Sequence, residues 1–533
     1  MNIVADRWRR KFLALQTNWL LERTSRSVSR HASPNPNEQP IVFFNASTRL
    51  RDLSQNAAFQ LLTSWALRLA GIPVVHFVCH AGMSRCVLGT NQYDHTAPPP
   101  CVTCIRYSQR LVSGAEARWF SYQEDASLSS ELENRDLDRL SCFEYQGMPL
   151  GSLVLPSLRW ILRRHHLPDD EPTRFLFRQY ILSAWNVAQE FKRLIDDIQP
   201  KVVVVFNGVM FPEAVAGWVA KSREVRVVTH EVGFQPLSAF FTDGQATAYP
   251  IEIPPGFELT SEQNRRLDVY LEKRFQGEFT MAGIRFWPHM RGLSEEFLNR
   301  VEQFEQVVPI FTNVAFDTSQ VHANVVFPQM FAWLDLILEI IRANSKTLFI
   351  IRAHPDEKRA GTRKLSRESV SDWVINNHLV ELPNIVFIDS QEYISSYELI
   401  LRAKFIMVYS SSIGLEASVL GKPVLCGGQS RYTRYPIVFF PQSPEAYREQ
   451  AQQLLNTDHT LQPPEHQQNA RRFLYFQLFK ASLSFENYLY ASSVPGYVNL
   501  RPFHWHSLLS SSSLTSRILL KGLTDHAPFL ISE

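Results

Sequence analysis

Three consecutive serines, Ser410, Ser411 and Ser412, follow the apolar segment FIMVY (405–409) and precede a segment with helical spacing. A helix N-terminus presents unpaired backbone N–H groups and a partial positive charge, and serine hydroxyls add hydrogen-bond donors. This pattern could hold a phosphate group without a Walker-type lysine, while Glu416 in the first turns of the helix could bond a ribose. The alternative is ordinary N-capping by Ser412, which any helix can use.

A second polar group ends the apolar segment IIRAHPDE (350–357), with Arg352, His354 and Glu357 at the rim of the same sheet. Pro355 holds His354 in an extended conformation. From there the ring of His354 can donate to a phosphate oxygen, and Arg352 can pair with one through two N–H groups. The alternative is that His354 caps a loop and Arg352 forms an ion pair. Because the serines follow a neighbouring strand, we predict a shared phosphate site.

Four cysteines gather in one short region of the first half: Cys79, Cys86, Cys101 and Cys104. Four thiolates in a loop-rich stretch predict a structural, tetrahedral zinc site. Two alternatives stay open, namely buried free thiols and a disulfide formed on oxidation. Six cysteines in 533 residues do not make a disulfide scaffold, and Cys142 and Cys426 are expected in the core.

Strands and helices alternate along the first half. After a polar linker at 33–40, short apolar runs and helical spacing predict strands at 41–48 and 72–79 around a helix at 55–70. An irregular stretch at 80–150 follows. We then predict two helices and a second strand–helix–strand unit, at 152–165, 173–197, 201–208, 212–224 and 226–233. A mixed region, 234–304, contains one charged helix near 261–275.

The second half repeats this alternation. The predicted strands are 307–316, 346–355, 384–390, 405–412 and 423–428, with helices at 328–343, 395–402 and 413–421 between them. Helical patterns resume at 445–456 and 466–490, and a Ser-rich tail follows. Strand–helix–strand units place parallel strands in one sheet, so the fold class is α/β with two tandem Rossmann-like domains, a C-terminal helical segment and a tail.

The predicted domain boundaries follow from these elements. They are an N-terminal arm and linker (1–40), a first Rossmann-like domain (41–304) with a Cys-rich insertion (79–104), a second Rossmann-like domain (305–440), C-terminal helices (441–490) and a tail (491–533). Ligands of such sheets bind at the carboxyl ends of the strands. We therefore expect the loops after residues 45, 207, 230, 313, 353 and 409 to face one cleft.

Several segments of the second half resemble the capsule polysaccharide biosynthesis family, which is glycosyltransferase-like and of the GT-B fold. They are TNVAFDTSQ (312–320), IIRAHPDE (350–357), YSSSIGLEASVLGKPVLCGG (409–428) and RYTRY with FPQSPEAY (431–447). The resemblance covers residues 305–450, and the first half resembles the family only in topology.

The resemblance implies roles for particular residues. In related enzymes that use CMP-activated sugars, an HP motif and a serine pair hold the nucleotide phosphate. By resemblance these duties fall on His354, Pro355, Ser411 and Ser412, with Glu416 near the nucleoside. Phe316–Asp317 stands where the family has a WD-type element, so Asp317 is expected to contact donor or acceptor.

A transferase of this kind needs a general base near the acceptor hydroxyl. Glu231, next to His230 at a strand end, is our predicted base, and Asn207 at the preceding strand end is a candidate substrate contact. The alternative for Glu231 is a structural carboxylate paired with an arginine. Three polar residues after the first strand are expected to form a solvated loop, with acceptor contact as the alternative: Arg49, Arg51 and Asp52.

The function predicted from the resemblance is a GT-B glycosyltransferase. It would move a sugar from a CMP- or NDP-linked donor to a surface polysaccharide or a lipid-linked acceptor. Catalysis would need no cofactor, since His354 and helix dipoles would stabilise the leaving phosphate. Two alternatives stay open: an enzyme similar to non-hydrolysing UDP-N-acetylglucosamine 2-epimerases, suggested by SSSIGLEASVLGKPVL (410–425), and an inactive assembly subunit.

Composition excludes some partners. With 54 basic and 52 acidic residues the net charge is +2, which does not suggest nucleic-acid binding by bulk charge. We find no secretory signal and no run of 18 apolar residues, so a cytoplasmic location is expected. The segment 7–30 is basic with interleaved apolar residues. It predicts either a helix packed on the protein or an amphipathic helix on the inner face of the cell membrane.

Overall fold

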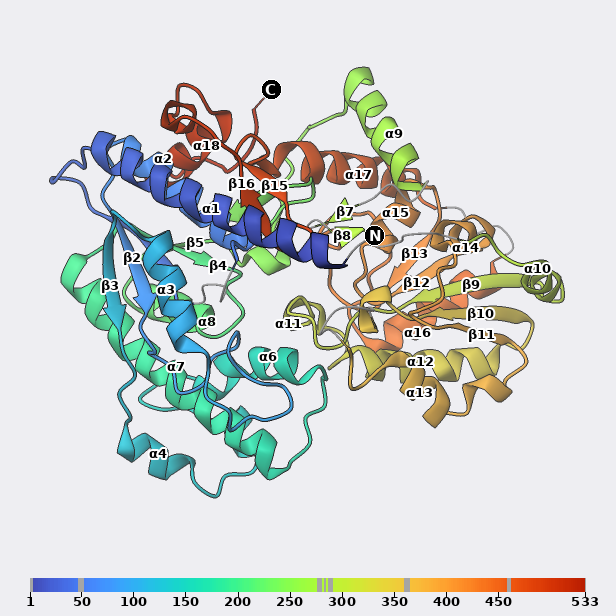
Figure 1. Cartoon of the computed structure of the whole chain (residues 1–533). Helices are drawn as coiled ribbons and strands as arrows, with labels where there is room; N and C mark the ends of the chain where they lie inside the picture. The colour runs from blue at the N-terminus through green and yellow to red at the C-terminus, as the bar shows by residue number, and fades with distance from the viewer. Residues whose placement is uncertain are drawn as a thin grey trace.

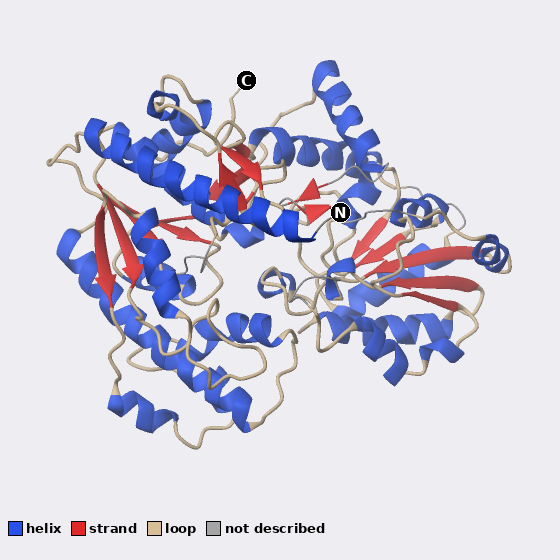
Figure 2. Ribbon diagram, in the orientation of Figure 1, coloured by secondary structure: helices blue, strands red, loops and turns tan. Residues whose placement is uncertain are grey.

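A computed structural model describes residues 3–46, 52–275, 280–281, 284–285, 291–358, 365–457 and 462–532 of the 533-residue chain. Figure 1 and Figure 2 show two separate sheets, each with helices on both faces. Among the described residues, no helix is long and apolar enough to cross a membrane.

The first sheet has a central run of five parallel strands in the order β3-β2-β1-β4-β5. These strands are β1 (Ile41–Asn45), β2 (Val74–Cys79), β3 (Glu116–Phe120), β4 (Val202–Phe206) and β5 (Arg226–Val232). Two antiparallel strands, β6 (Ser238–Thr242) and β14 (Leu483–Ser484), extend it beyond β5. An order of 3-2-1-4-5 is that of a doubly wound Rossmann-like domain.

Side chains of β1 alternate between two cores. Val42 and Phe44 pack with α6 (Leu150–Leu162), α7 (Glu171–Ile198) and α8 (Glu213–Ser222). Ile41 and Phe43 face the opposite core, formed with α1 (Ile3–His31), α2 (Gln55–Leu69), α3 (Cys101–Leu111) and α18 (Leu514–Asp525). Because both faces of the sheet are covered, a central strand such as VVVVF in β4 is apolar at every position.

The second sheet repeats the same order with five parallel strands, β11-β10-β9-β12-β13. They are β9 (Gln306–Phe311), β10 (Thr347–Arg352), β11 (Ile385–Ile388), β12 (Ile406–Val408) and β13 (Val424–Cys426). One face is covered by α12 (Met330–Ala343), α13 (Val370–Asn376) and α16 (Pro444–Asn456). The other is covered by α9 (Ser261–Phe275), α14 (Ser396–Arg402), α15 (Ile413–Val419) and α17 (Pro464–Tyr475).

The predicted fold class is therefore confirmed: the chain is α/β with two tandem Rossmann-like domains in a GT-B arrangement. The remaining short helices lie in connections. They are α4 (Ala126–Leu132), α5 (Leu137–Ser141), α10 (Glu295–Val301) and α11 (Gln320–Ala323). Two short strands, β7 (Thr280–Met281) and β8 (Ile284–Arg285), pair with each other.

Two regions differ from the sequence prediction. The stretch 80–150 is more regular than expected, since it contains α3 and the sheet strand β3, whose outward residues in EARWF are too polar for an apolar-run signal. The helical pattern predicted to run to residue 490 stops at Lys480 after a π-turn. Beyond it the chain forms β14, then a hairpin of β15 (Leu489–Ala491) and β16 (Val498–Leu500).

The segment predicted as a tail packs on the first domain. Leu500, Leu519, Leu523 and Phe529 are buried in the core formed by α1, α2 and the first sheet. Figure 1 shows α18 and the C-terminus beside α1 and α2. The prediction missed this because its apolar residues are spread among serines, and only burial against distant segments reveals their role.

We predict that Leu519→Ala destabilises the first domain although Leu519 lies close to the end of the sequence. The side chain is 1% exposed. Removing its methyl groups should leave a cavity and lower the free energy of unfolding by about 3 kcal/mol. Denaturant unfolding measures this, with Leu514→Ala, at a 45% exposed position of the same helix, as the control. Equal stability of the two variants would contradict the packing.

Candidate active site

A cleft of about 1630 Å³ lies between the two domains. The strand ends that the sequence predicted to face it do line it, through Asn45, Asn207 and Glu231 on one side and Asn313, His354 and Ser410 on the other. These positions lie within two residues of the carboxyl ends of β1, β4, β5, β9, β10 and β12. The carboxyl ends of both parallel sheets thus face one space.

The cleft passes over the switch point of each sheet, where the strand order reverses direction. In the second sheet this point lies between β9 and β12, and the Asn313 amide donates there to the Ser410 hydroxyl at 3.0 Å. In the first sheet it lies between β1, which ends at Asn45, and β4, which Asn207 follows. Ligands of doubly wound sheets bind in the crevice at such points.

The turn between β12 and α15 carries the three serines, all of which line the cleft. Tyr432 donates to the carbonyl oxygen of Ser411 at 2.6 Å and fixes the turn. Gly414 is required here because a Cβ atom would lie 2.5 Å from the Tyr432 hydroxyl oxygen. Ser412 occupies the N-cap position, but within the described residues its hydroxyl makes no capping hydrogen bond. Simple N-capping therefore does not account for Ser412.

His354 also lines the cleft, directly after β10. Its Nδ1 accepts a hydrogen bond from the backbone N–H of Asp356 at 3.1 Å. In the neutral ring the proton must then be on Nε2, so the ring can donate through that atom. His354 thus caps a local turn, which was the alternative predicted from the sequence. The same contact orients the ring so that Nε2 can donate a hydrogen bond.

The other two residues predicted at this rim, Arg352 and Glu357, are buried. Arg352 is 2% exposed, and its Nη1 donates to the Asp389 carbonyl oxygen at 2.9 Å. Burial lowers the pKa of Arg352 to about 10. Glu357 is 1% exposed and accepts the backbone N–H of Val370 at 3.1 Å, so it turns toward α13. Arg352 still reaches the cleft lining, whereas Glu357 belongs to the core.

Glu416, predicted to bond a ribose, lies in the cleft lining with both carboxylate oxygens already engaged. Oε1 pairs with Arg274 of α9, and Oε2 accepts the hydroxyl of Tyr397. The paired carboxylate raises the pKa of Arg274 against its burial, so the guanidinium is charged. A carboxylate oxygen can accept more than one hydrogen bond, which leaves room for a ligand hydroxyl.

Glu231 stands on the opposite wall of the cleft, held by two amides. Asn207 donates to Oε2 at 3.0 Å and Asn56 to Oε1 at 3.4 Å. Within the described part of the chain Glu231 forms no ion pair, so the alternative of a carboxylate paired with an arginine is not realised. Burial raises the pKa of Glu231 against the opposing effect of these hydrogen bonds, and the Asp317 carboxylate adds to the rise. A carboxylate with a raised pKa is a better proton acceptor than an ordinary glutamate.

Asn207 is positioned by an unusual backbone conformation, with φ at 64°. Asparagine tolerates this left-handed region better than most residues. Its Oδ1 accepts the backbone N–H groups of Val209 and Met210, each at 3.1 Å, which turns Nδ2 toward Glu231. By contrast, His230 is fully buried against Phe241, and burial lowers its pKa to about 3. His230 is therefore a neutral core residue.

Asp317 is exposed at the cleft and bends back on its own loop. Its Oδ1 accepts the backbone N–H and the hydroxyl of Ser319, at 2.9 and 2.7 Å. Asp317 lies close enough to Glu231 and to Arg163 to influence both of their pKa values, so this residue of the second domain approaches the first-domain wall of the cleft. Asp52 also lines the cleft, whereas Arg49 and Arg51 lie outside the described residues.

Several cationic side chains of the cleft were missed by the sequence analysis: Arg163, Arg274, Arg431 and Arg434. Arg163 is 4% exposed and stacks on the ring of Trp160, with its guanidinium carbon 3.9 Å from the ring centroid. Burial lowers its pKa to about 10. No motif marks Arg163, because the second ring that it contacts, Phe316, belongs to a distant part of the chain. The sequence signal for Arg431 and Arg434 is the segment RYTRY (431–435), in which two arginines alternate with aromatic residues.

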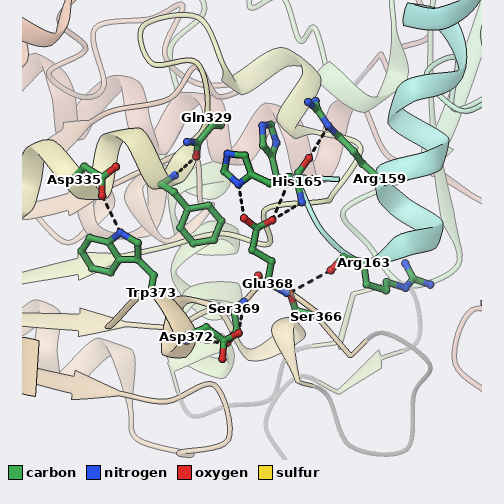
Figure 3. A network of polar contacts seen from close by, with 12 residues as sticks. Arg159, Arg163, His165, Gln329, Asp335, Ser366, Glu368, Ser369, Asp372 and Trp373 are labelled. Atoms are coloured by element: carbon green, nitrogen blue, oxygen red, sulfur yellow. Dashed lines mark hydrogen bonds and ion pairs between the residues drawn. The ribbon is translucent and has the colours of Figure 1, made fainter. Parts of the chain in front are cut away.

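A group of hydrogen bonds between the two domains fixes the turn that carries Arg163 (Figure 3). Glu368, just before α13, accepts the backbone N–H groups of His165 and His166 at 2.8 and 2.9 Å. The backbone N–H of Arg367 donates to the carbonyl oxygen of Arg163 at 2.8 Å. Hydrogen bonds to a carboxylate are stronger than neutral ones. These hydrogen bonds therefore connect the first domain to the second at the margin of the cleft.

The four clustered cysteines line one small apolar cavity beside the cleft. Backbone N–H groups of Gly82 and Gly89 donate to the sulfur atoms of Cys79 and Cys86, at 3.2 and 3.3 Å. Burial raises the pKa of both thiols to about 12. Among the described residues, no three His, Cys, Asp or Glu side chains are arranged to hold a metal ion. A structural zinc at Cys79, Cys86, Cys101 and Cys104 stays a prediction, which metal analysis of the purified protein tests.

The chain matches no protein-family model and no curated protein. It is similar to solved structures that include a beta Kdo 2,4 transferase, KpsC of Thermosulfurimonas dismutans. That match has 12% identity and a TM-score of 0.35, and covers 56% of this chain and 84% of that one. Sucrose-phosphate synthase of Thermosynechococcus elongatus follows, with 11% identity, a TM-score of 0.29, and 83% and 95% coverage.

A third similar structure is UDP-GlcNAc 2-epimerase of Neisseria meningitidis bound to UDP-GlcNAc. Its identity is 13% and its TM-score 0.24, with coverage of 82% of this chain and 99% of that one. Transferases and epimerases thus both occur among the similar structures. With similarities this low, the fold assignment depends on the strand order and the function on the cleft.

We predict that Glu357 makes stability depend on pH. Burial raises its pKa from 4.5 to about 8. Between these values the folded protein holds a proton that the unfolded chain releases, so the free energy of unfolding falls as pH rises from about 4.5 to about 8. Glu357→Gln should flatten this part of the profile, measured by denaturant unfolding at several pH values. Glu381→Gln, at a site with a 78% exposed side chain, is the control. An unchanged slope in Glu357→Gln would contradict the assignment.

Proposed function

We propose that this chain is a GT-B glycosyltransferase that moves a sugar from a CMP- or NDP-linked donor to a surface-polysaccharide or lipid-linked acceptor. One observation carries the proposal. A single cleft has hydrogen-bond donors for a phosphate on one wall and a half-buried carboxylate with a raised pKa on the other. Transfer of a sugar from a nucleotide needs both groups, facing each other across the reacting carbon.

The donor would bind to the second domain. Its phosphate is expected to accept hydrogen bonds from Nε2 of His354 and from the hydroxyls of Ser411 and Ser412. The sugar-bearing nucleoside would extend toward Glu416 and its partner Arg274. As the bond from the anomeric carbon to the phosphate oxygen breaks, the oxygen keeps the electron pair, and these donors would stabilise the added negative charge. We expect this step to need no divalent cation.

The acceptor would bind to the first domain. Glu231 would take the proton of the acceptor hydroxyl while that oxygen forms its bond to the anomeric carbon. Asn207 and Asn56 act as positioning residues, because they hold the carboxylate without neutralising it by an ion pair. Arg163 and Asp317 are candidate contacts for polar groups of either substrate at the junction of the domains.

Nucleotide binding is the first test. We expect one of CMP, UDP, GDP and dTDP to raise the thermal unfolding midpoint of the wild-type protein, because a ligand that binds only the folded state stabilises it. His354→Ala should weaken this binding about tenfold or more, while His378→Ala, at an exposed site of the same domain, should not. The shift should persist in EDTA. A protein that binds none of the four nucleotides would favour the inactive assembly subunit.

Acid–base chemistry is the second test. With radiolabelled donor and acceptor, Glu231→Gln should lower kcat by about 100-fold or more and leave nucleotide binding unchanged. Asn207→Ala removes a hydrogen bond to the charged carboxylate, so the acidic limb of the pH–rate profile should move to higher pH. Glu262→Gln, on the surface of α9, is the control. Isomer exchange of the donor sugar without any acceptor would contradict transfer and indicate an epimerase.

A further inference from the structure

Helix α1 lies along the outside of the first domain and has two different faces (Figure 1). The inner face is buried through Leu20, Leu21 and Val28, which join the core of the first sheet. Thr17 on the same face accepts a hydrogen bond from the backbone N–H of Leu500 at 3.4 Å. The helix is therefore anchored to the folded domain, and its outer face has a fixed direction.

The outer face carries a stripe of large apolar side chains. Trp8, Phe12, Leu15 and Trp19 are 68, 66, 68 and 56% exposed. Spacings of four, three and four residues place them along one line of the helix. Single exposed apolar residues are common on protein surfaces, but an aligned group of this size marks an interaction surface.

Cationic side chains surround and continue this stripe. Arg23, Arg26 and Arg30 follow on the same line with spacings of four, three and four, and all three are exposed. The exposed residues Arg9, Arg10 and Lys11 add three charges near Trp8. Lys11 and Arg23 lie over the rings of Trp8 and Trp19, at 5.6 and 5.1 Å from the centroids. This density of cations on one helix stands out in a chain whose net charge is only +2.

One acidic residue lies close to this surface within the described part of the helix. Glu22 is 41% exposed and pairs with Arg110 of α3 at 2.9 Å and with Arg26 at 3.8 Å. Both pairs lie at the side of the outer face. The outer face thus combines an apolar stripe with groups of positive charge at both of its ends, and the described residues neutralise little of this charge.

We propose that the outer face of α1 binds an anionic membrane surface. Tryptophan and phenylalanine would enter the boundary between headgroups and acyl chains, and the arginines and lysine would pair with lipid phosphates. These positive charges, with Glu22 as their acidic neighbour in the described part of the helix, complement the negative surface potential of an anionic lipid layer. The inference does not depend on the proposed chemistry of the cleft, because it uses only the exposed face of α1.

Vesicle flotation with the full-length protein tests this. We expect binding to phosphatidylcholine vesicles that contain about 30% phosphatidylglycerol, much weaker binding to pure phosphatidylcholine, and a decrease as salt screens the charges. The double variant Trp8→Gln, Trp19→Gln should lose about tenfold or more in affinity. The matched control Ile375→Gln, Val380→Gln, at exposed apolar sites of the second domain, should bind as the wild type does.

A second pair of variants separates charge from apolar contact. Arg23→Glu with Arg26→Glu should abolish binding to the anionic vesicles, while Arg139→Glu with Arg265→Glu, at exposed sites elsewhere, should reduce it little. Each variant should keep the wild-type thermal unfolding midpoint, since the changed residues face outward. Failure of the wild type to float with anionic vesicles would overturn the proposal. So would a concentration-dependent dimer that the tryptophan variant disrupts while vesicle binding persists.

Discussion

A parallel sheet with helices on both faces leaves only its strand ends for polar chemistry. Both domains obey this constraint, because every position of β4 and β10 is apolar or buried up to its last residue. Polar side chains can then appear only where a strand stops, and in parallel strands all of these points lie at one edge. Two such edges facing each other form one cleft. The polar residues at the strand ends of each domain line the wall of the cleft on that side.

The two walls of the cleft each carry a carboxylate, and the two carboxylates differ in their partners. On the first domain, Glu231 is surrounded by the amides of Asn56 and Asn207, which can stabilise a carboxylate but cannot neutralise it. On the second domain, Glu416 pairs with the Arg274 guanidinium. The carboxylate of Glu231 has a raised pKa and no cationic partner among the described residues, whereas the carboxylate of Glu416 is held by Arg274 and Tyr397. This difference supports an assignment of chemistry to the first wall and of binding to the second.

Much of this could be predicted from sequence, for local reasons. The apolar runs of β1, β4 and β10, and the helix boundaries of α2 and α9, follow from short-range patterns, and strand ends followed by polar residues identified the cleft side. The prediction failed where packing between different segments determines the position of a side chain. Arg163 is a cleft residue only because Trp160 and Phe316 enclose it, and Glu357 turns inward only because α13 offers its N-terminal N–H. Phe316 and Val370 lie far along the chain or in another element, so these contacts cannot be identified from the sequence next to Arg163 and Glu357.

The C-terminal segment contacts both helix α1 and the lining of the cleft. After leaving the second domain, the chain returns to the first, where β16 lies against α1 and the preceding turn places Gly496 and Tyr497 in the cleft lining. The backbone N–H of Gln55 donates to the carbonyl oxygen of Gly496 at 3.1 Å, at the start of the helix that carries Asn56. A rigid chain of contacts therefore runs from α1 through β16 to the residues that hold Glu231. If α1 rests on a membrane, these contacts keep the acceptor wall at a fixed position relative to that surface.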